Sequence, residues 1–180
     1  MLKRIITLVA LSVLCACSSV SVTDYAEFQP TIEPKNFFKG ELRAHGVIKN
    51  RGHRVIRTFN AQINAYWNDG IGTLEEDFVF NDGEKQRRIW TLTPNENGGY
   101  TGTAGDVIGG GLMTFSGNTI FLDYILRVAY GDSTLDVHVD DRMYLLSEDV
   151  LINESRMTKF GVTVGYIDLV IIRQAPSPST

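Results

Sequence analysis

The chain has 180 residues, of which 43% are hydrophobic and 21% are charged. This length suits one domain with a substantial core. Its 21 acidic and 17 basic residues give a formal net charge of −4 at pH 7, and without a basic patch to neutralise phosphates we expect no nucleic-acid partner.

Residues 1–16 predict a signal peptide. Lys3 and Arg4 supply positive charge, and residues 5–14 are apolar apart from Thr7 and Ser12. A charged start followed by a short apolar run is typical of an export signal. The run has ten residues, whereas a membrane-spanning helix needs about 20. We therefore expect this segment to be cut off rather than kept as an anchor.

Both cysteines of the chain, Cys15 and Cys17, lie where this segment ends. Cys17 follows a small residue, Ala16, and has the apolar Leu14 three positions before it, which is the pattern of a bacterial lipobox. We expect Cys17 to become the lipidated first residue of the mature chain, because several acyl chains give a lasting hold on a membrane. Cys15 leaves with the signal peptide. The alternative is an ordinary signal peptide with a chance cysteine near its end.

Lipidation of Cys17 would place the protein in the cell envelope. Serine at position 18 is typical of sorting to the outer membrane in cells with two membranes, so we expect an outer-membrane anchor that faces the periplasm. No thiol would remain for a disulfide. Without residues 1–16 the chain keeps 15 basic and 21 acidic residues, a net charge of −6.

The mature chain divides into three parts. Residues 17–36 predict a lipidated N-terminus and tether, residues 37–173 a single β-barrel domain, and residues 174–180 a disordered Pro/Ser tail. Apolar and polar residues alternate with a period of two through residues 55–67, which is typical of a strand with one buried face. The pattern recurs later in the chain, at residues 120–130 and 135–139, and the run at 162–172 is apolar on nearly both faces.

Turn signals separate these runs. They lie at 68–70 (NDG), 81–83 (NDG), 97–99 (NGG), 116–118 (SGN) and 131–132 (GD). Asn, Asp and Gly tolerate the positive φ angles of tight hairpins, and the spacing leaves no room for crossover helices. We therefore predict an all-β fold, an antiparallel meander of about eight to ten strands that closes into a soluble β-barrel.

A membrane-spanning barrel is the alternative, with apolar side chains facing outward. Glu75, Glu76 and Asp77 argue against it, because we interpret them as a solvated run at an exposed strand start.

Short motifs along the mature chain resemble one family of bacterial lipoproteins. They are 24–25 (DY), 37–40 (FFKG), 67–70 (WNDG), 80–83 (FNDG), 105–109 (GDVIG), 117–118 (GN), 140–145 (DDRMYL), 151–153 (LIN) and 159–161 (KFG). The set is similar to the family catalogued as domain of unknown function 3833, and its most specific part is residues 140–161. The resemblance implies an envelope lipoprotein with a lipocalin-like barrel and no established activity. Arg142 stands where the family commonly has an aromatic residue.

Inward-facing aromatic residues are the candidate lining of a cavity. They are Phe59, Trp67, Phe78, Trp90, Tyr124 and Tyr144. Three polar residues, Asp140, Asp141 and Arg142, are candidates for the interior, because neighbouring residues of a strand face opposite sides and one of the two aspartates must then face inward. A buried carboxylate needs a partner, such as Arg142, Arg127 or the Tyr144 hydroxyl.

Other patterns predict no chemistry. Asp136, His138 and Asp140 share one strand face, but we interpret them as a solvated polar face rather than metal ligands. The glycine-rich residues 105–111 lack the lysine and helix of a phosphate loop and are more typical of a bulge or a barrel corner. We therefore predict no catalytic residue, no cofactor and no metal site.

Three functions stay open. The first is a non-catalytic binder or carrier of a lipid or fatty-acid-like ligand in an apolar cavity. The second is an envelope scaffold or assembly protein with a filled core. The third is an envelope enzyme that uses an interior Asp, Tyr or His.

Overall fold

The structure, a computed structural model, describes residues 19–175. The predicted signal peptide, Cys17 and the last five residues of the predicted tail lie outside the described residues. The described part contains two short helices, η3 (Val22–Tyr25) and α1 (Pro34–Phe37). Its strands are β1 (Gly40–Asn50), β2 (Val55–Asn68), β3 (Ile71–Phe80), β4 (Lys85–Pro94), β5 (Tyr100–Thr103), β6 (Val107–Ser116), β7 (Thr119–Tyr130), β8 (Ser133–Ser147), β9 (Val150–Lys159) and β10 (Val162–Arg173).

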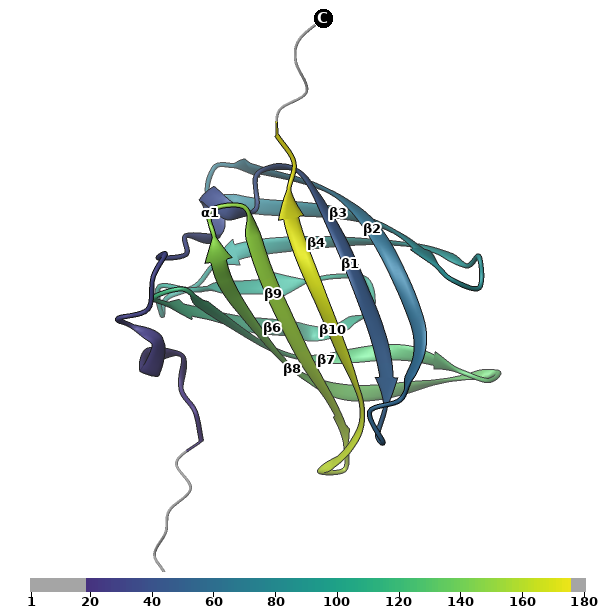
Figure 1. Cartoon of the computed structure of the whole chain (residues 1–180). Coiled ribbons are helices and arrows are strands. Elements are labelled where there is room, and N and C mark those ends of the chain that lie inside the picture. The colour runs from purple at the N-terminus through teal and green to yellow at the C-terminus, as the bar shows by residue number, and fades with distance from the viewer. Residues whose placement is uncertain (1–18, 176–180) are drawn as a thin grey trace, which may run out of the picture.

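The ten strands form one closed antiparallel barrel (Figure 1). Each strand pairs with the next along the chain, and β1 pairs with β10 from Leu42↔Arg173 to Asn50↔Gly165 to close the ring. Closure leaves the sheet without a first and a last strand to act as open edges. The predicted fold class, a closed antiparallel barrel, is confirmed.

Side chains alternate between the two faces of the wall. On β2 the inward Phe59, Ala61, Ile63 and Ala65 are buried, and the residues between them are exposed. Charged pairs lie on the outer face, such as Arg87 with Glu75. This is the predicted arrangement and the reverse of the apolar outer band of a transmembrane barrel. Neither helix of the described chain has the length and apolar character needed to cross a membrane.

The segment before β1 closes one end of the barrel. Ile32, Phe37 and Phe38 are buried in the core cluster. The indole Nε1 of Trp67 donates to the Phe38 carbonyl at 2.7 Å, and the Ile32 amide donates to the Gly117 carbonyl at 2.7 Å. Part of the predicted tether 17–36 is therefore a plug that belongs to the core. We call this end of the barrel the plugged end.

The opposite end is the mouth. It is formed by the β1–β2, β3–β4, β7–β8 and β9–β10 turns, whose tips extend away from α1 (Figure 1). The barrel wall is shorter on the mouth side at β5. This strand pairs with residues 91–94 of β4 but not with residues 85–90, which lie nearer the mouth. A register shift between Ile108 and Leu112 marks a bulge in β6, where Gly109 and Gly110 have φ angles of 71° and 83°. The bulge predicted for residues 105–111 is confirmed.

The described residues hold a complete folding unit. All ten strands, the closing ladder and the packed core lie within residues 19–175. A chain of residues 19–180 therefore retains all ten strands, the plug and the core.

Candidate ligand cavity

A cavity of about 770 Å³ lies inside the barrel and extends from Phe38 and Leu92, in the plugged half, to the mouth. Its size lies within the range of about 300–1,000 Å³ that is usual for small-molecule sites. The half nearer the mouth is lined mainly by apolar side chains, which are Ile48, Phe59, Phe78, Phe80, Leu126, Val128, Leu135, Val137, Met157, Ile167 and Leu169. Buried side chains such as Ile120, Leu145 and Leu151 pack in the half of the barrel nearer the plug.

Aromatic rings contact one another along the cavity wall. The ring centres of Phe59 and Phe78 lie 5.6 Å apart, and Phe78 stacks on Phe80 at 6.2 Å. Deeper in the barrel, Trp90 meets Tyr124 edge to face at 5.4 Å. These contacts fix the rings, so that they offer a rigid apolar surface to a ligand.

Polar side chains from several elements meet at mid-depth. They are Glu76 of β3, Arg88 of β4, Asp106 of the β5–β6 loop, Tyr124 of β7, Asp141 of β8, and Asn153 and Ser155 of β9. We call these seven residues the polar cluster. Apolar residues line the cavity on both sides of the cluster, toward the mouth and toward Phe38 of the plug, so the cluster forms a polar band at mid-depth.

Arg88 and Asp106 form an ion pair within the cluster. Arg88 donates to Asp106 Oδ2 through Nη2 at 2.7 Å and through Nε at 3.0 Å. Their side chains are only 18% and 23% exposed. The second carboxylate oxygen of Asp106, Oδ1, is buried and has no hydrogen-bond partner among residues 19–175.

Asp141 is a buried carboxylate with its hydrogen bonds satisfied. It is 7% exposed and accepts from Asn153 Nδ2 at 3.0 Å, from the Tyr124 hydroxyl at 3.3 Å and from the Ser155 hydroxyl. Burial raises the pKa of Asp141, and the three hydrogen bonds offset this only in part. The hydrogen bonds hold Tyr124, Asn153 and Ser155 around Asp141 at mid-depth in the cavity.

Glu76 differs from both aspartates because no described residue forms a hydrogen bond or ion pair with its carboxylate. It faces inward on β3, between the inward Leu74 and Phe78. Burial raises the pKa of Glu76 from 4.5 to about 7, the charge of Arg88 opposes this rise, and Asp106 and Asp141 add to it. The cavity therefore contains a carboxyl that is available to a ligand and about half ionised at neutral pH.

The predicted lining residues fall into three groups. Phe59, Phe78, Trp90 and Tyr124 line the cavity. Trp67 faces inward at the plugged end, where its ring packs on Tyr100 at 5.3 Å and helps to hold the plug. The prediction for Tyr144 was wrong. Its side chain lies on the outer face, with its ring 5.6 Å from that of Tyr25.

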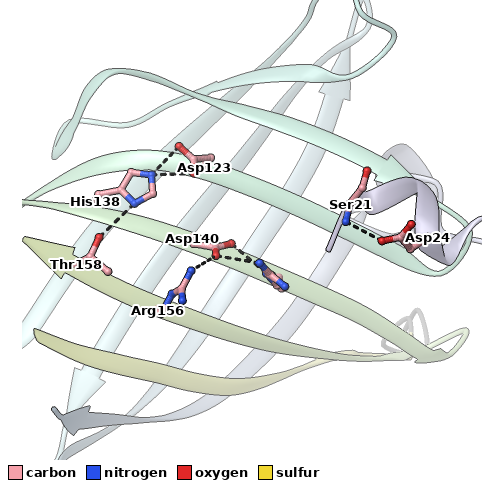
Figure 2. A network of polar contacts seen from close by, with 8 residues as sticks. Ser21, Asp24, Asp123, His138, Asp140, Arg156 and Thr158 are labelled. Atoms are coloured by element: carbon pink, nitrogen blue, oxygen red, sulfur yellow. Dashed lines mark hydrogen bonds and ion pairs between the residues drawn. The ribbon is translucent and has the colours of Figure 1, made fainter. Parts of the chain in front are cut away.

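Two of the three predicted interior polar residues also lie outside. Alternation along β8 places Asp141 inward, so Asp140 and Arg142 face outward. Figure 2 shows Asp140 in a network on the outer wall, where it accepts from Arg156 at 3.0 Å and from Arg142 at 3.1 Å. The interior assignment of Asp140 and Arg142 was therefore wrong.

The outer polar face of β8 is the one that the sequence predicts. His138 contacts Asp123 at 2.8 Å, and Arg127 donates to Asp136 at 2.7 Å (Figure 2 shows the first pair). Asp136 and His138 thus pair across to the neighbouring strand β7.

The interpretation of residues 75–77 as a solvated run was wrong for Glu76. Glu75 and Asp77 face outward and pair with Arg87, but Glu76 is in phase with the inward Leu74, Phe78 and Phe80. The two-residue spacing of Glu76 from Leu74 and from Phe78 could have predicted its inward position from the sequence. Arg88 and Asp106 were missed altogether, because nothing in the spacing of the chain links a strand position to a loop 18 residues later.

The chain is a closed, ten-stranded antiparallel barrel with an internal cavity. It belongs to the family described as "Protein of unknown function (DUF3833)", whose model matches residues 11–173. The resemblance seen in the sequence is thus confirmed. No curated protein matches the chain.

Three solved structures are similar to the chain. Rv2717c from M. tuberculosis is similar at 16% sequence identity and a TM-score of 0.55, over 83% of this chain and 100% of that one. The S-type phycobiliprotein lyase CPES from Guillardia theta matches at 11% identity and a TM-score of 0.48, over 77% of this chain and 89% of that one. The protein in "Structure of EF1p2_mFAP2b bound to DFHBI" matches at 9% identity and a TM-score of 0.45, over 77% and 94%. The similarity to Rv2717c, at 16% identity, bears on the fold alone.

Proposed function

We propose that the protein is a membrane-anchored lipoprotein of the cell envelope that binds an amphipathic small molecule inside its barrel without altering it. The observation that carries this proposal is the cavity of about 770 Å³, with its apolar mouth half and its polar cluster at mid-depth. A ligand matched to this order has an apolar chain toward the mouth and a polar group at the cluster. A hollow of this size is not the filled core that the scaffold hypothesis requires.

The anchor rests on the lipobox around Cys17. Lipidation there would hold the barrel at a membrane, for which the outer membrane facing the periplasm is our proposal. Expression with a labelled fatty acid tests the anchor: Cys17→Ser should leave an unprocessed precursor without label. Cys15→Ser is the matched control and should be processed and labelled as usual. A labelled Cys17→Ser chain would contradict the lipidation site.

One observation favours a second candidate, an envelope enzyme. The pKa of Glu76, about 7, suits a group that takes up and releases a proton at neutral pH. Binding is preferred because most of the cavity wall is apolar.

Ligand binding can be tested on residues 19–180. We expect native mass spectrometry to show a bound small molecule, or the empty barrel to take up the neutral fluorescent probe N-phenyl-1-naphthylamine. Leu135→Trp places an indole in the apolar part of the cavity and should abolish uptake. Thr134→Trp, on the exposed face of the same strand, should not. A chain that is folded by circular dichroism but takes up neither probe nor any of a panel of fatty acids and phospholipids would overturn the proposal.

A further inference from the structure

The charges that line the cavity are unequal. The polar cluster contains three carboxyl groups, those of Glu76, Asp106 and Asp141, and one guanidinium, that of Arg88. Arg88 is already paired with Asp106. With all carboxyls ionised, the cluster has a net charge of −2, and with Glu76 protonated it has a net charge of −1.

The two other cationic side chains at the cavity are also paired. Arg57, near the mouth, contacts Asp82 at 2.7 Å and Glu84 at 2.6 Å. Arg127 contacts Asp136 at 2.7 Å. Each lining guanidinium among the described residues therefore has a carboxylate partner, so none is left to receive the carboxylate of a fatty acid.

Aromatic rings stand beside the free carboxyl. Phe78 follows Glu76 by two residues on the same face of β3, and Trp90 follows Arg88 by two residues on β4. Trp90 and Tyr124 meet edge to face, so their rings are fixed in two different planes. Ring faces attract organic cations, above all quaternary ammonium groups, and a nearby carboxylate adds to this attraction.

We propose that the polar cluster selects an organic cation, so that the ligand of the barrel is a molecule with an apolar chain and an amine or quaternary ammonium head. Glu76 is the group that faces this head, with Trp90 and Tyr124 as its aromatic neighbours. The inference rests on the proposed function, because it names the polar end of the same ligand. It departs from the expected fatty-acid-like ligand, whose carboxylate would be repelled by the cluster.

A bare metal ion fits this site less well than an organic cation. No three His, Cys, Asp or Glu side chains within residues 19–175 are placed to hold a metal ion together. Asp141 already accepts three hydrogen bonds, and Arg88 pairs with one oxygen of Asp106 and leaves Oδ1 without a partner among the described residues. Glu76 is thus the carboxyl with both oxygens left for the ligand.

Three probes of equal chain length test the proposal: dodecyltrimethylammonium, dodecanoate and dodecanol. Each competes with N-phenyl-1-naphthylamine for residues 19–180 at pH 8, below the concentration at which micelles form. We expect the ammonium probe to bind at least about tenfold more tightly than dodecanoate, with dodecanol between them. Dodecanoate binding as tightly as the ammonium probe would overturn this inference and leave the proposed function standing. Binding of no probe would overturn both.

A pair of variants separates a binding role from a structural one. Glu76→Gln removes the charge at nearly constant shape and should weaken the ammonium probe about tenfold, with the affinity for dodecanol unchanged. Glu75→Gln makes the same change on the outer face, where the residue pairs with Arg87 at 3.0 Å, and should leave both affinities unchanged. Unaltered ammonium binding by a folded Glu76→Gln chain would contradict the assignment of Glu76.

Discussion

Glu76 and Arg88 are register partners on β3 and β4, and both side chains face into the barrel, yet Arg88 bonds to Asp106 instead. The arrangement leaves a carboxyl without a hydrogen bond in a place where burial makes its charge costly. A purely structural ion pair would have joined the two neighbours. The separation is therefore more consistent with a site kept open for a ligand.

The first prediction concerns stability against pH. The folded chain holds the proton of Glu76 up to about pH 7, whereas the unfolded chain releases it near pH 4.5, so this group lowers stability as pH rises between those values. Glu76→Gln removes that cost. We expect the variant to match the parent at pH 4 and to exceed its free energy of unfolding by ~3 kcal/mol at pH 8. Urea denaturation at both pH values measures this, and a pH-independent difference would contradict it.

The second prediction concerns ligand affinity against pH. Glu76 is faced by Arg88 from β4, Asp106 from the β5–β6 loop, Tyr124 from β7 and Asp141 from β8. Because Glu76 gains its charge near pH 7, the affinity for dodecyltrimethylammonium should rise from pH 6 to pH 8. Titration calorimetry can follow this rise, which should be absent in Glu76→Gln. A falling affinity would mean that another group governs binding.

The third prediction compares two neighbouring arginines. Arg88→Met leaves Asp106 buried without its partner, which should cost about 3–5 kcal/mol. Arg87→Met is the matched control, because Arg87 is 53% exposed on the outer face and its pairs with Glu75 and Asp77 should be worth about 1 kcal/mol or less. Chemical denaturation gives both values. Equal losses of unfolding free energy in the two variants would show that the buried Arg88–Asp106 pair stabilises the fold no more than the exposed pairs of Arg87.

The fourth prediction compares two neighbouring aspartates. Asp141→Asn replaces an acceptor of three hydrogen bonds with a group that accepts on one side only, and should cost about 1–3 kcal/mol. Asp140→Asn changes the outer network and should cost about 1 kcal/mol or less. Thermal unfolding at pH 7 measures the difference, and a larger loss from Asp140→Asn would contradict the assignment of the two faces.

The fifth prediction concerns the contact between the N-terminal segment and the β6–β7 turn. Gly117 has a φ of 54°, and a Cβ there would lie 1.7 Å from the Tyr25 carbonyl oxygen. Gly131 has a φ of 57° but no neighbour within 4 Å. Gly131→Ala should thus cost only the conformational strain, about 1–2 kcal/mol, whereas Gly117→Ala should cost more and expose residues 19–30 to proteases. Limited proteolysis with thermal unfolding separates the two, and equal effects would contradict the contact.

The barrel was predictable because its causes are local. Alternation along β2 and β8 reports which face is buried, and the Asn, Asp and Gly turns report hairpins. The same alternation shows that Asp141 shares a face with Val137 and Val139, so Asp140 and Tyr144 must lie outside. The position of each residue in the inward–outward alternation of β8 thus predicted its face better than its chemical type did.

The polar cluster was not predictable in the same way. Its members come from five strands and a loop, and their meeting depends on how far each strand is staggered against the next. The pair of Arg88 with Asp106 depends on the shortness of β5, which lets the loop reach mid-depth. Glu76 was assigned to the surface because residues 75–77 are all acidic, although the alternation along β3 places Glu76 on the inner face.

The position of the plug sets the direction in which an anchored barrel would face. η3 packs through Tyr25 on Phe121 and Tyr144, on the outer wall near the plugged end. Cys17 precedes Ser19 by two residues, which span at most ~7 Å. A lipid on Cys17 would therefore draw the plugged end toward the bilayer and turn the mouth outward. Cargo would enter and leave on the aqueous side, away from the leaflet that holds the protein.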